Sequence, residues 1–144
     1  MAENTADKGH SVLMKLLSAF SYNDCKPYKA FVKIFDSKIA SILLYGPNIW
    51  GLTYMQCTES VHVVACKRFL NVPKYACNNS VLGDLARFPL YLYSCKRCIK
   101  YWIRITRMPN NRLVKKCYVM MKLYDNNGHT NWATIVRKRL YENG

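Results

Sequence analysis

The sequence predicts an all-α fold, a small helical bundle followed by a helical extension. Apolar residues recur three and four positions apart along most of the chain, which is the spacing of an amphipathic helix. Most glycine and proline residues fall between these periodic segments. No stretch alternates apolar and polar residues with the period of two that is typical of strands, and there is no internal repeat.

Three helices are expected in the first half of the chain. The first covers about 6–20 and ends in a polar turn. Asp24 can cap the second, which has Pro27 in its first turn, where a missing amide donor does no harm, and which stops at a Gly-Pro pair. The third begins within 58–60. In the second of these helices, Lys38 fits the apolar pattern imperfectly, because helical spacing places it in the arc of the apolar residues. The residues expected to face the core are Phe31, Phe35, Ile39, Ile42, Ala65, Cys66, Phe69 and Leu70.

The second half begins after the best internal boundary in the sequence. Residues 71–79 contain Pro73 and are expected to form a turn. We therefore predict two domains, a helical bundle over 1–72 and a basic helical extension over 73–144. The helices expected in the extension cover about 80–86, 89–107, 112–124 and 131–141.

The charge balance is the strongest compositional signal. The chain has 22 Lys and Arg residues against 8 Asp and Glu residues, a formal net charge of +14. Such an excess opposes compaction through self-repulsion, and a polyanionic partner explains why it is tolerated. We expect that partner to be nucleic acid, as RNA, DNA or a hybrid duplex. Solubility alone is the alternative.

The helix over 89–107 is expected to present a row of cations. At about 100° per residue, Lys96, Lys100, Arg104 and Arg107 share an arc of about 80°, with Arg97 at its edge; we call these five residues the cationic ridge. Like charges on neighbouring turns repel one another unless phosphates or other anions neutralise them. An ordinary solvated helix face is the alternative. The apolar residues on roughly the opposite side are Tyr91, Cys95, Ile99 and Trp102. The candidate nucleic-acid-binding residues are the ridge residues Lys96, Arg97, Lys100, Arg104 and Arg107, together with Lys115 and Lys116.

The cysteines favour a reducing compartment. The chain has seven, an odd number, and no secretory signal is visible at the start of the sequence, so we expect an intracellular protein of the nucleus or cytoplasm. Cys95 and Cys98 form a CxxC motif. A zinc site would need a second such pair or two suitably spaced histidines, and neither occurs. We therefore expect packed thiols, with no metal and no cofactor.

The sequence lacks the signatures of a catalytic site. Two-metal polymerase or nuclease chemistry needs converging carboxylates, yet no two of the eight acidic residues lie closer than four positions apart. A glycine-rich phosphate loop and a recognisable Ser or Cys nucleophile setting are also missing. We expect no catalytic residues and no enzymatic activity of the chain's own.

One uncharged stretch, Ile39–Thr58, is just long enough to span a bilayer. Gly46, Pro47, Asn48 and Gly51 interrupt it in the middle. We therefore expect a buried helix followed by a turn, and no membrane association.

Several segments occur in a distinctive order, with Tyr-Gly followed by Ile-Trp, a Cys-Lys-Arg helix, and a Trp followed six residues on by Met-Pro. The segments are 35–38, 43–50 (LLYGPNIW), 61–70 (VHVVACKRFL), 79–90 (NSVLGDLARFPL) and 96–109 (KRCIKYWIRITRMP). Over about 8–120, this order resembles the region after the catalytic palm in reverse transcriptases of non-LTR, LINE-like retrotransposons. Asn48, where the family usually has an acid, and Ala86, where glycine is common, depart from the pattern.

The resemblance implies specific roles for the two predicted domains. Residues 1–72 are similar to a thumb, a helical bundle that grips the template-primer duplex, and the rest resembles the linker that follows it. The family's polymerase site lies upstream, in a palm with a Phe- or Tyr-Ala-Asp-Asp motif that this sequence lacks. The resemblance therefore implies activity only together with the palm and fingers of a reverse transcriptase.

The leading hypothesis is a non-catalytic nucleic-acid-binding fragment or derivative of a retrotransposon reverse transcriptase. Two other classes stay open. One is a relic open reading frame without selected activity. The other is a protein-interaction adaptor that uses the aromatic residues Tyr45, Trp50 and Tyr54.

Overall fold

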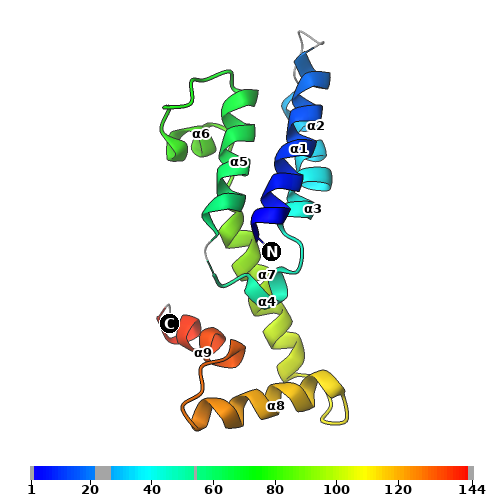
Figure 1. The fold of residues 1–144 in the computed structure, drawn as a ribbon, viewed down its shortest axis with the longest axis vertical. Helices are drawn as coiled ribbons and strands as arrows, with labels where there is room; N and C mark the ends of the chain where they lie inside the picture. The colour runs from blue at the N-terminus through cyan, green and yellow to red at the C-terminus, as the bar shows by residue number, and fades with distance from the viewer. Residues whose placement is uncertain (1, 22–26, 54, 143–144) are drawn as a thin grey trace. The chain divides into compact units, whose positions relative to one another are not determined.

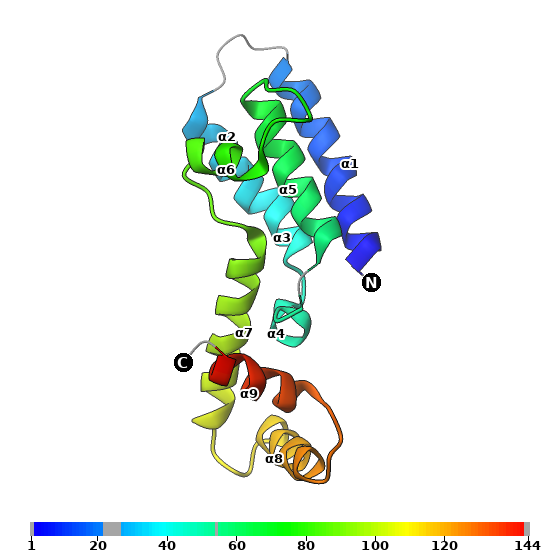
Figure 2. The same cartoon turned by 90° about the vertical axis from the view of Figure 1, so that its left-hand side faces the viewer.

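The computed structural model describes residues 2–21, 27–53 and 55–142. Within these ranges the backbone forms nine α-helices and one π-helical segment and contains no strand (Figures 1 and 2). This confirms the predicted all-α fold class. Asp24, the expected cap of the second helix, lies outside the described residues.

The chain divides into two compact units. The first unit consists of Met1–Tyr45 and Tyr54–Tyr93, and the second of Gly46–Thr53 and Ser94–Gly144. The short segment 46–53 therefore belongs with helices far along the chain. The predicted division into 1–72 and 73–144 stays a prediction about sequence segments, and the compact units do not coincide with it, because residues 73–93 belong to the first unit.

In the first unit, α1 lies against α3 and α5, and α5 also contacts α6 (Figures 1 and 2). Pro27 stands at the N-cap of α2 and not, as expected, within its first turn. Its extended backbone, with ψ 122°, leads the chain into the helix. The elements of this unit are α1 (Ala2–Ser21), α2 (Tyr28–Ile34), η1 (Phe35–Ile39), α3 (Ala40–Leu43), α5 (Gln56–Phe69) and α6 (Asn78–Asp84), followed by the start of α7 (Leu90–Thr106).

The π-helical segment η1 keeps a row of apolar side chains on one face of the helix. Phe31, Phe35, Ile39 and Leu43 follow one another every four residues, and all four are fully buried. In a regular α-helix each such step drifts by about 40°, so the last residue would lie about 120° from the first. The i→i+5 hydrogen bonds of η1 widen the turn and take up this drift. The same change leaves Lys38 exposed, whereas a regular helix would place it among the apolar residues.

The row packs on α5. The rings of Phe31 and Phe69 stack with centroids 4.2 Å apart. Ala65 and Cys66 are fully buried as expected, whereas Phe69 and Leu70 are half-buried. Ile42, also expected in the core, is only half-buried. Each buried phenylalanine contributes about 2 to 3 kcal/mol to stability, so Phe31 and Phe35 are substantial members of the apolar core of the first unit.

The second unit contains α4 (Pro47–Trp50), most of α7, α8 (Leu113–Asn126) and α9 (Trp132–Glu142). Its small core consists of Leu52, Cys98 and Val136, which are at most 4 % exposed. Partly buried residues surround this core: Cys95, Trp102, Trp132 and Leu140.

Hydrogen bonds hold the segment 46–53 in the second unit. The Cys98 thiol donates to the carbonyl of Asn48 at 3.3 Å, and the Cys95 thiol donates to that of Gly51 at 3.4 Å. The indole of Trp132 also donates to the Asn48 carbonyl, at 3.2 Å. The CxxC thiols are therefore packed, as predicted. The structure adds that both donate hydrogen bonds, to carbonyls at the end of a short helix.

The uncharged stretch Ile39–Thr58 is broken in the structure. It holds the end of η1, α3, α4 and the start of α5, with Gly46 in the left-handed region at φ 67°. Among the described residues, no helix combines the length and apolar character needed to cross a membrane.

Two Gly→Ala variants test the packing around segment 46–53. A Cβ on Gly51 would lie 2.7 Å from the Ser94 carbonyl oxygen, which cannot move without shifting α7. A Cβ on Gly83, in α6, would meet nothing within 4 Å. We expect Gly51→Ala to lower the free energy of unfolding by about 1 to 3 kcal/mol and Gly83→Ala to leave it unchanged or raise it by up to about 1 kcal/mol. Urea denaturation followed by circular dichroism measures both, and equal effects would contradict the described packing.

Candidate nucleic-acid interface

Positive charge is concentrated in the second unit. Its two segments, 46–53 and 94–144, contain twelve Lys and Arg residues against two acidic residues, so they carry +10 of the chain's +14. The first unit has ten cationic residues against six acidic ones, a net +4. The second unit is therefore the part of the chain that attracts a polyanion most strongly.

Four residues of the cationic ridge lie on the solvent side of α7, and the fifth, Arg107, stands in the turn directly after the helix. All five ridge residues are exposed. Ser94, Cys98 and Ile105, on the other side of the same helix, are at most 3 % exposed. The buried face is thus centred on these three residues, and not on the predicted set, in which Cys95, Ile99 and Trp102 are half-buried.

No acid of the described residues neutralises the ridge. The only two acidic residues in the sequence of the second unit are Asp125 and Glu142. The Asp125 carboxylate accepts a hydrogen bond from Thr134 Oγ1 at 2.8 Å and pairs with Arg137 at 3.1 Å. Glu142 pairs with Arg139 at 3.5 Å. Within the described part of the chain the five ridge side chains have no ion pair, so their charge is available to an external anion.

The two predicted lysines of α8 differ from each other. Lys116 is exposed. Lys115 is half-buried, and its ammonium donates to the carbonyl of Thr106, the last residue of α7, at 2.7 Å. A cation at a helix C-terminus satisfies an unpaired carbonyl and the helix dipole. Lys115 therefore has a structural contact that the sequence did not indicate. Arg112, which is exposed at the N-cap of α8, was not predicted as a candidate.

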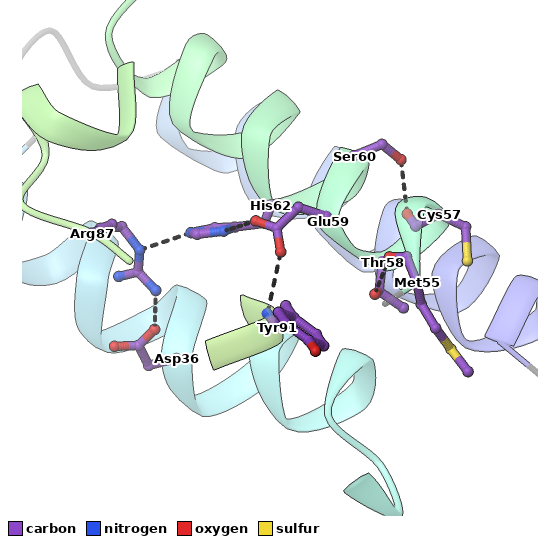
Figure 3. A network of polar contacts seen from close by, with 9 residues as sticks. All are labelled: Asp36, Met55, Cys57, Thr58, Glu59, Ser60, His62, Arg87 and Tyr91. Atoms are coloured by element: carbon purple, nitrogen blue, oxygen red, sulfur yellow. Dashed lines mark hydrogen bonds and ion pairs between the residues drawn. The ribbon is translucent and has the colours of Figure 1, made fainter. Parts of the chain in front are cut away.

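A chain of polar contacts crosses the first unit (Figure 3). Arg87 pairs with Asp36, lies 4.8 Å from the centroid of the Phe35 ring, and donates from Nε to His62 Nε2 at 3.0 Å. His62 Nδ1 lies 3.1 Å from Glu59 Oε1. Sequence reasoning missed this network, although the i,i+3 spacing of a Glu and a His on one helix was a usable signal.

The network determines which nitrogen of His62 carries the proton. Arg87 can only donate, so Nε2 of the fully buried ring accepts and Nδ1 donates to Glu59. The other oxygen of Glu59 accepts from the backbone N–H of Tyr91, in the first turn of α7, at 3.3 Å. A free N–H at a helix N-terminus is thereby satisfied. Every member of the chain has a partner, which is typical of a structural network.

The described residues contain no cluster of three or more His, Cys, Asp or Glu side chains that could hold a metal ion. The acidic residues of the network, Asp36 and Glu59, are separated by Arg87 and His62. Their arrangement supplies no pair of carboxylates facing a common point.

Comparison of the chain with protein-family models, with curated proteins and with solved structures gave no match. The resemblance to non-LTR reverse transcriptases therefore stays a prediction.

Arg87→Met tests the structural role of the network. Methionine keeps an apolar stem near Phe35 but leaves the ring nitrogen of His62 and the Asp36 carboxylate without their donor. We expect the free energy of unfolding to fall by about 1 to 3 kcal/mol, and the proton of His62 to lose its preference for Nδ1 in ¹⁵N NMR spectra. Arg68→Met, at an exposed position on α5, is the control and should change neither. An unaltered His62 spectrum in Arg87→Met would disprove the hydrogen bond.

The cysteines should differ in reactivity. The backbone N–H and hydroxyl of Ser80 and the backbone N–H of Asn79 lower the pKa of the exposed Cys77 thiol. Burial raises the pKa of Cys66 to about 11. At pH 7.5 a lowered pKa means more thiolate and a raised one means less, so iodoacetamide should modify the exposed Cys77 well before the buried Cys66. Peptide mass spectrometry over a time course measures the order.

Proposed function

We propose that this chain is a non-catalytic nucleic-acid-binding fragment or derivative of a non-LTR retrotransposon reverse transcriptase. In this proposal the cationic ridge of α7 grips the phosphate backbone of a template-primer duplex. The single observation that supports it most is the placement of four exposed cations on α7 away from its buried face, with the exposed Arg107 directly after the helix, and none of the five has an ion pair among the described residues. The ordered segments that resemble the family supply the second support.

The dimensions of the ridge suit a phosphate row. Lys96 and Arg107 are eleven residues apart, which corresponds to about 16 Å along an α-helix. Phosphates of one strand follow each other at about 3.4 Å along the axis of a duplex. The ridge is therefore long enough to lie beside about five phosphates, with the arginines able to donate two hydrogen bonds each.

Catalysis would require a second polypeptide or a further segment. The metal-binding acids of the family lie in a palm motif that this sequence lacks. The palm and fingers of a reverse transcriptase are accordingly the proposed protein partners. The chain would bind the duplex, and its partner would supply the catalytic acids.

The other two hypotheses remain distinguishable from this one. A relic reading frame without selected activity would show a broad, uncooperative thermal transition. For the aromatic adaptor surface, the structure offers less support than the sequence did. Tyr45 and Trp50 belong to different units, and Tyr54 lies outside the described residues.

A salt series with matched variants tests the proposal. We expect the chain to bind a fluorescent RNA–DNA hybrid, with an affinity that falls steeply between 50 and 200 mM salt. Binding releases counterions from the phosphates, and this release becomes less favourable as the salt concentration rises. The variant Lys96→Ala, Lys100→Ala, Arg104→Ala, Arg107→Ala should reduce the slope of log affinity against log salt by about 3 to 4, because each phosphate contact contributes about 0.9. Fluorescence anisotropy measures both quantities.

The control removes the same charge elsewhere. Lys8, Lys15, Lys29 and Lys33 are exposed and belong to the first unit, so their joint replacement by alanine changes the net charge equally. We expect it to change the slope by less than about 1. Equal losses in both variants would mean that binding follows net charge and not the ridge. Salt-independent binding, or none at 50 mM salt, would refute the proposal altogether.

A further inference from the structure

The second unit has an apolar groove that the proposed function leaves unused. It has a volume of about 330 Å³ and lies between α7 and α8, with residues of α4 and α9 completing it. No charged side chain lines it. The side chains that matter here are Ile49, Leu113, Val114, Cys117 and Met121.

The groove leaves large apolar side chains in water. Ile49 is 74 % exposed and Leu113 is 76 % exposed. Over its whole length, α8 has no fully buried residue, although most of its side chains are apolar or aromatic. Exposed apolar surface gathered around a hollow is typical of a binding site, because burying it there releases water at little structural cost.

A cationic hollow continues the groove. Leu113 and Val114 line both, and the hollow adds Arg104 and Arg112, with no acidic residue among its lining. Neither arginine has an ion pair within the described part of the chain. An apolar slot that ends in two free guanidinium groups matches a ligand with apolar side chains followed by carboxylates.

We propose that this groove binds an acidic amphipathic helix of a protein partner. Apolar side chains of that helix, spaced three and four residues apart, enter the groove, and carboxylates one turn further on meet Arg104 and Arg112. The +10 charge of the second unit attracts a segment of this composition and repels a second copy of the chain. The ridge shares Arg104 with the cationic hollow, and it shares no residue with the apolar groove.

The same groove is a poor platform for nucleic acid bases. Stacking needs free aromatic faces. Here Tyr101 and Tyr118 each meet the Trp132 ring edge to face, with centroids 6.1 and 6.3 Å apart. The Tyr118 hydroxyl also accepts a hydrogen bond from the Trp102 indole at 2.9 Å. The rings are engaged with one another, so the groove offers apolar side chains and not open π surfaces.

A designed peptide provides the probe. It is a fluorescent 18-residue helix with leucines on one face and glutamates elsewhere. A second peptide has the same composition but its leucines are scattered around the helix. Anisotropy with the full chain at 150 mM salt should show saturable binding of the first peptide, and about tenfold weaker binding of the second, since only the first presents one apolar face. The RNA–DNA hybrid is measured in parallel.

Two exposed leucines of α8 give a matched pair of variants. Leu113 lines the groove, whereas Leu123, which is 59 % exposed, does not. We expect Leu113→Gln to weaken binding of the amphipathic peptide about fivefold to tenfold and Leu123→Gln to change it less than about twofold, with hybrid binding unaltered in both. Arg112→Glu should weaken binding of the amphipathic peptide about as much as Leu113→Gln does. Circular dichroism confirms that the variants fold.

Several results would overturn the inference. Equal affinity for the two peptides would show that charge alone attracts them, and absence of saturable binding up to 1 mM peptide would exclude the site. A loss of hybrid binding in Leu113→Gln would assign the groove to nucleic acid. Sedimentation that shows a dimer of the wild type, dissociated by Leu113→Gln, would assign it to a second copy. Failure of hybrid binding with intact peptide binding would refute only the proposed function.

Discussion

Uncompensated positive charge in the second unit is the constraint on which the rest of the structure depends. Ten net charges on fewer than half of the residues repel one another and oppose compaction. The unit places its ridge on the exposed side of α7 and gathers its few buried side chains, such as Cys98 and Val136, on the other side. An external anion that neutralised the ridge would stabilise the unit as well as bind it.

A core this small needs directional contacts beside apolar burial. The thiols of Cys95 and Cys98 and the indole of Trp132 bind carbonyls of segment 46–53, which contributes Leu52 to the core. Lys115 connects α8 to the last carbonyl of α7. The thiol and indole hydrogen bonds join residues that are 44 to 84 positions apart in the sequence. In these contacts the two thiols of the CxxC motif serve as hydrogen-bond donors.

In the first unit, by contrast, several charged side chains are paired with one another. Its network places Arg87 between His62 and Asp36, and Glu59 between His62 and the N-terminus of α7, so that the buried polar groups satisfy one another. Such a network rigidifies a helical bundle because each member fixes the orientation of the next. The contrast between this paired network and the ridge, which has no ion pair among the described residues, locates the candidate interface more firmly than net charge alone. It also leaves the groove beside Arg112 as a second surface of distinct chemistry.

The sequence by itself determined the helices and the ridge, because both depend on local periodicity. Helix ends were predicted to within a few residues in the second half, and the cations of α7 share a face whatever the helix packs against. The tertiary structure alone decided the widened π turn after Phe35, the contact of Lys115 with Thr106, and the pairing of Arg87 with His62. Each of these joins groups through space or relieves a conflict that arises only on packing. Sequence spacing carries no information about such contacts until the core has placed the helices side by side.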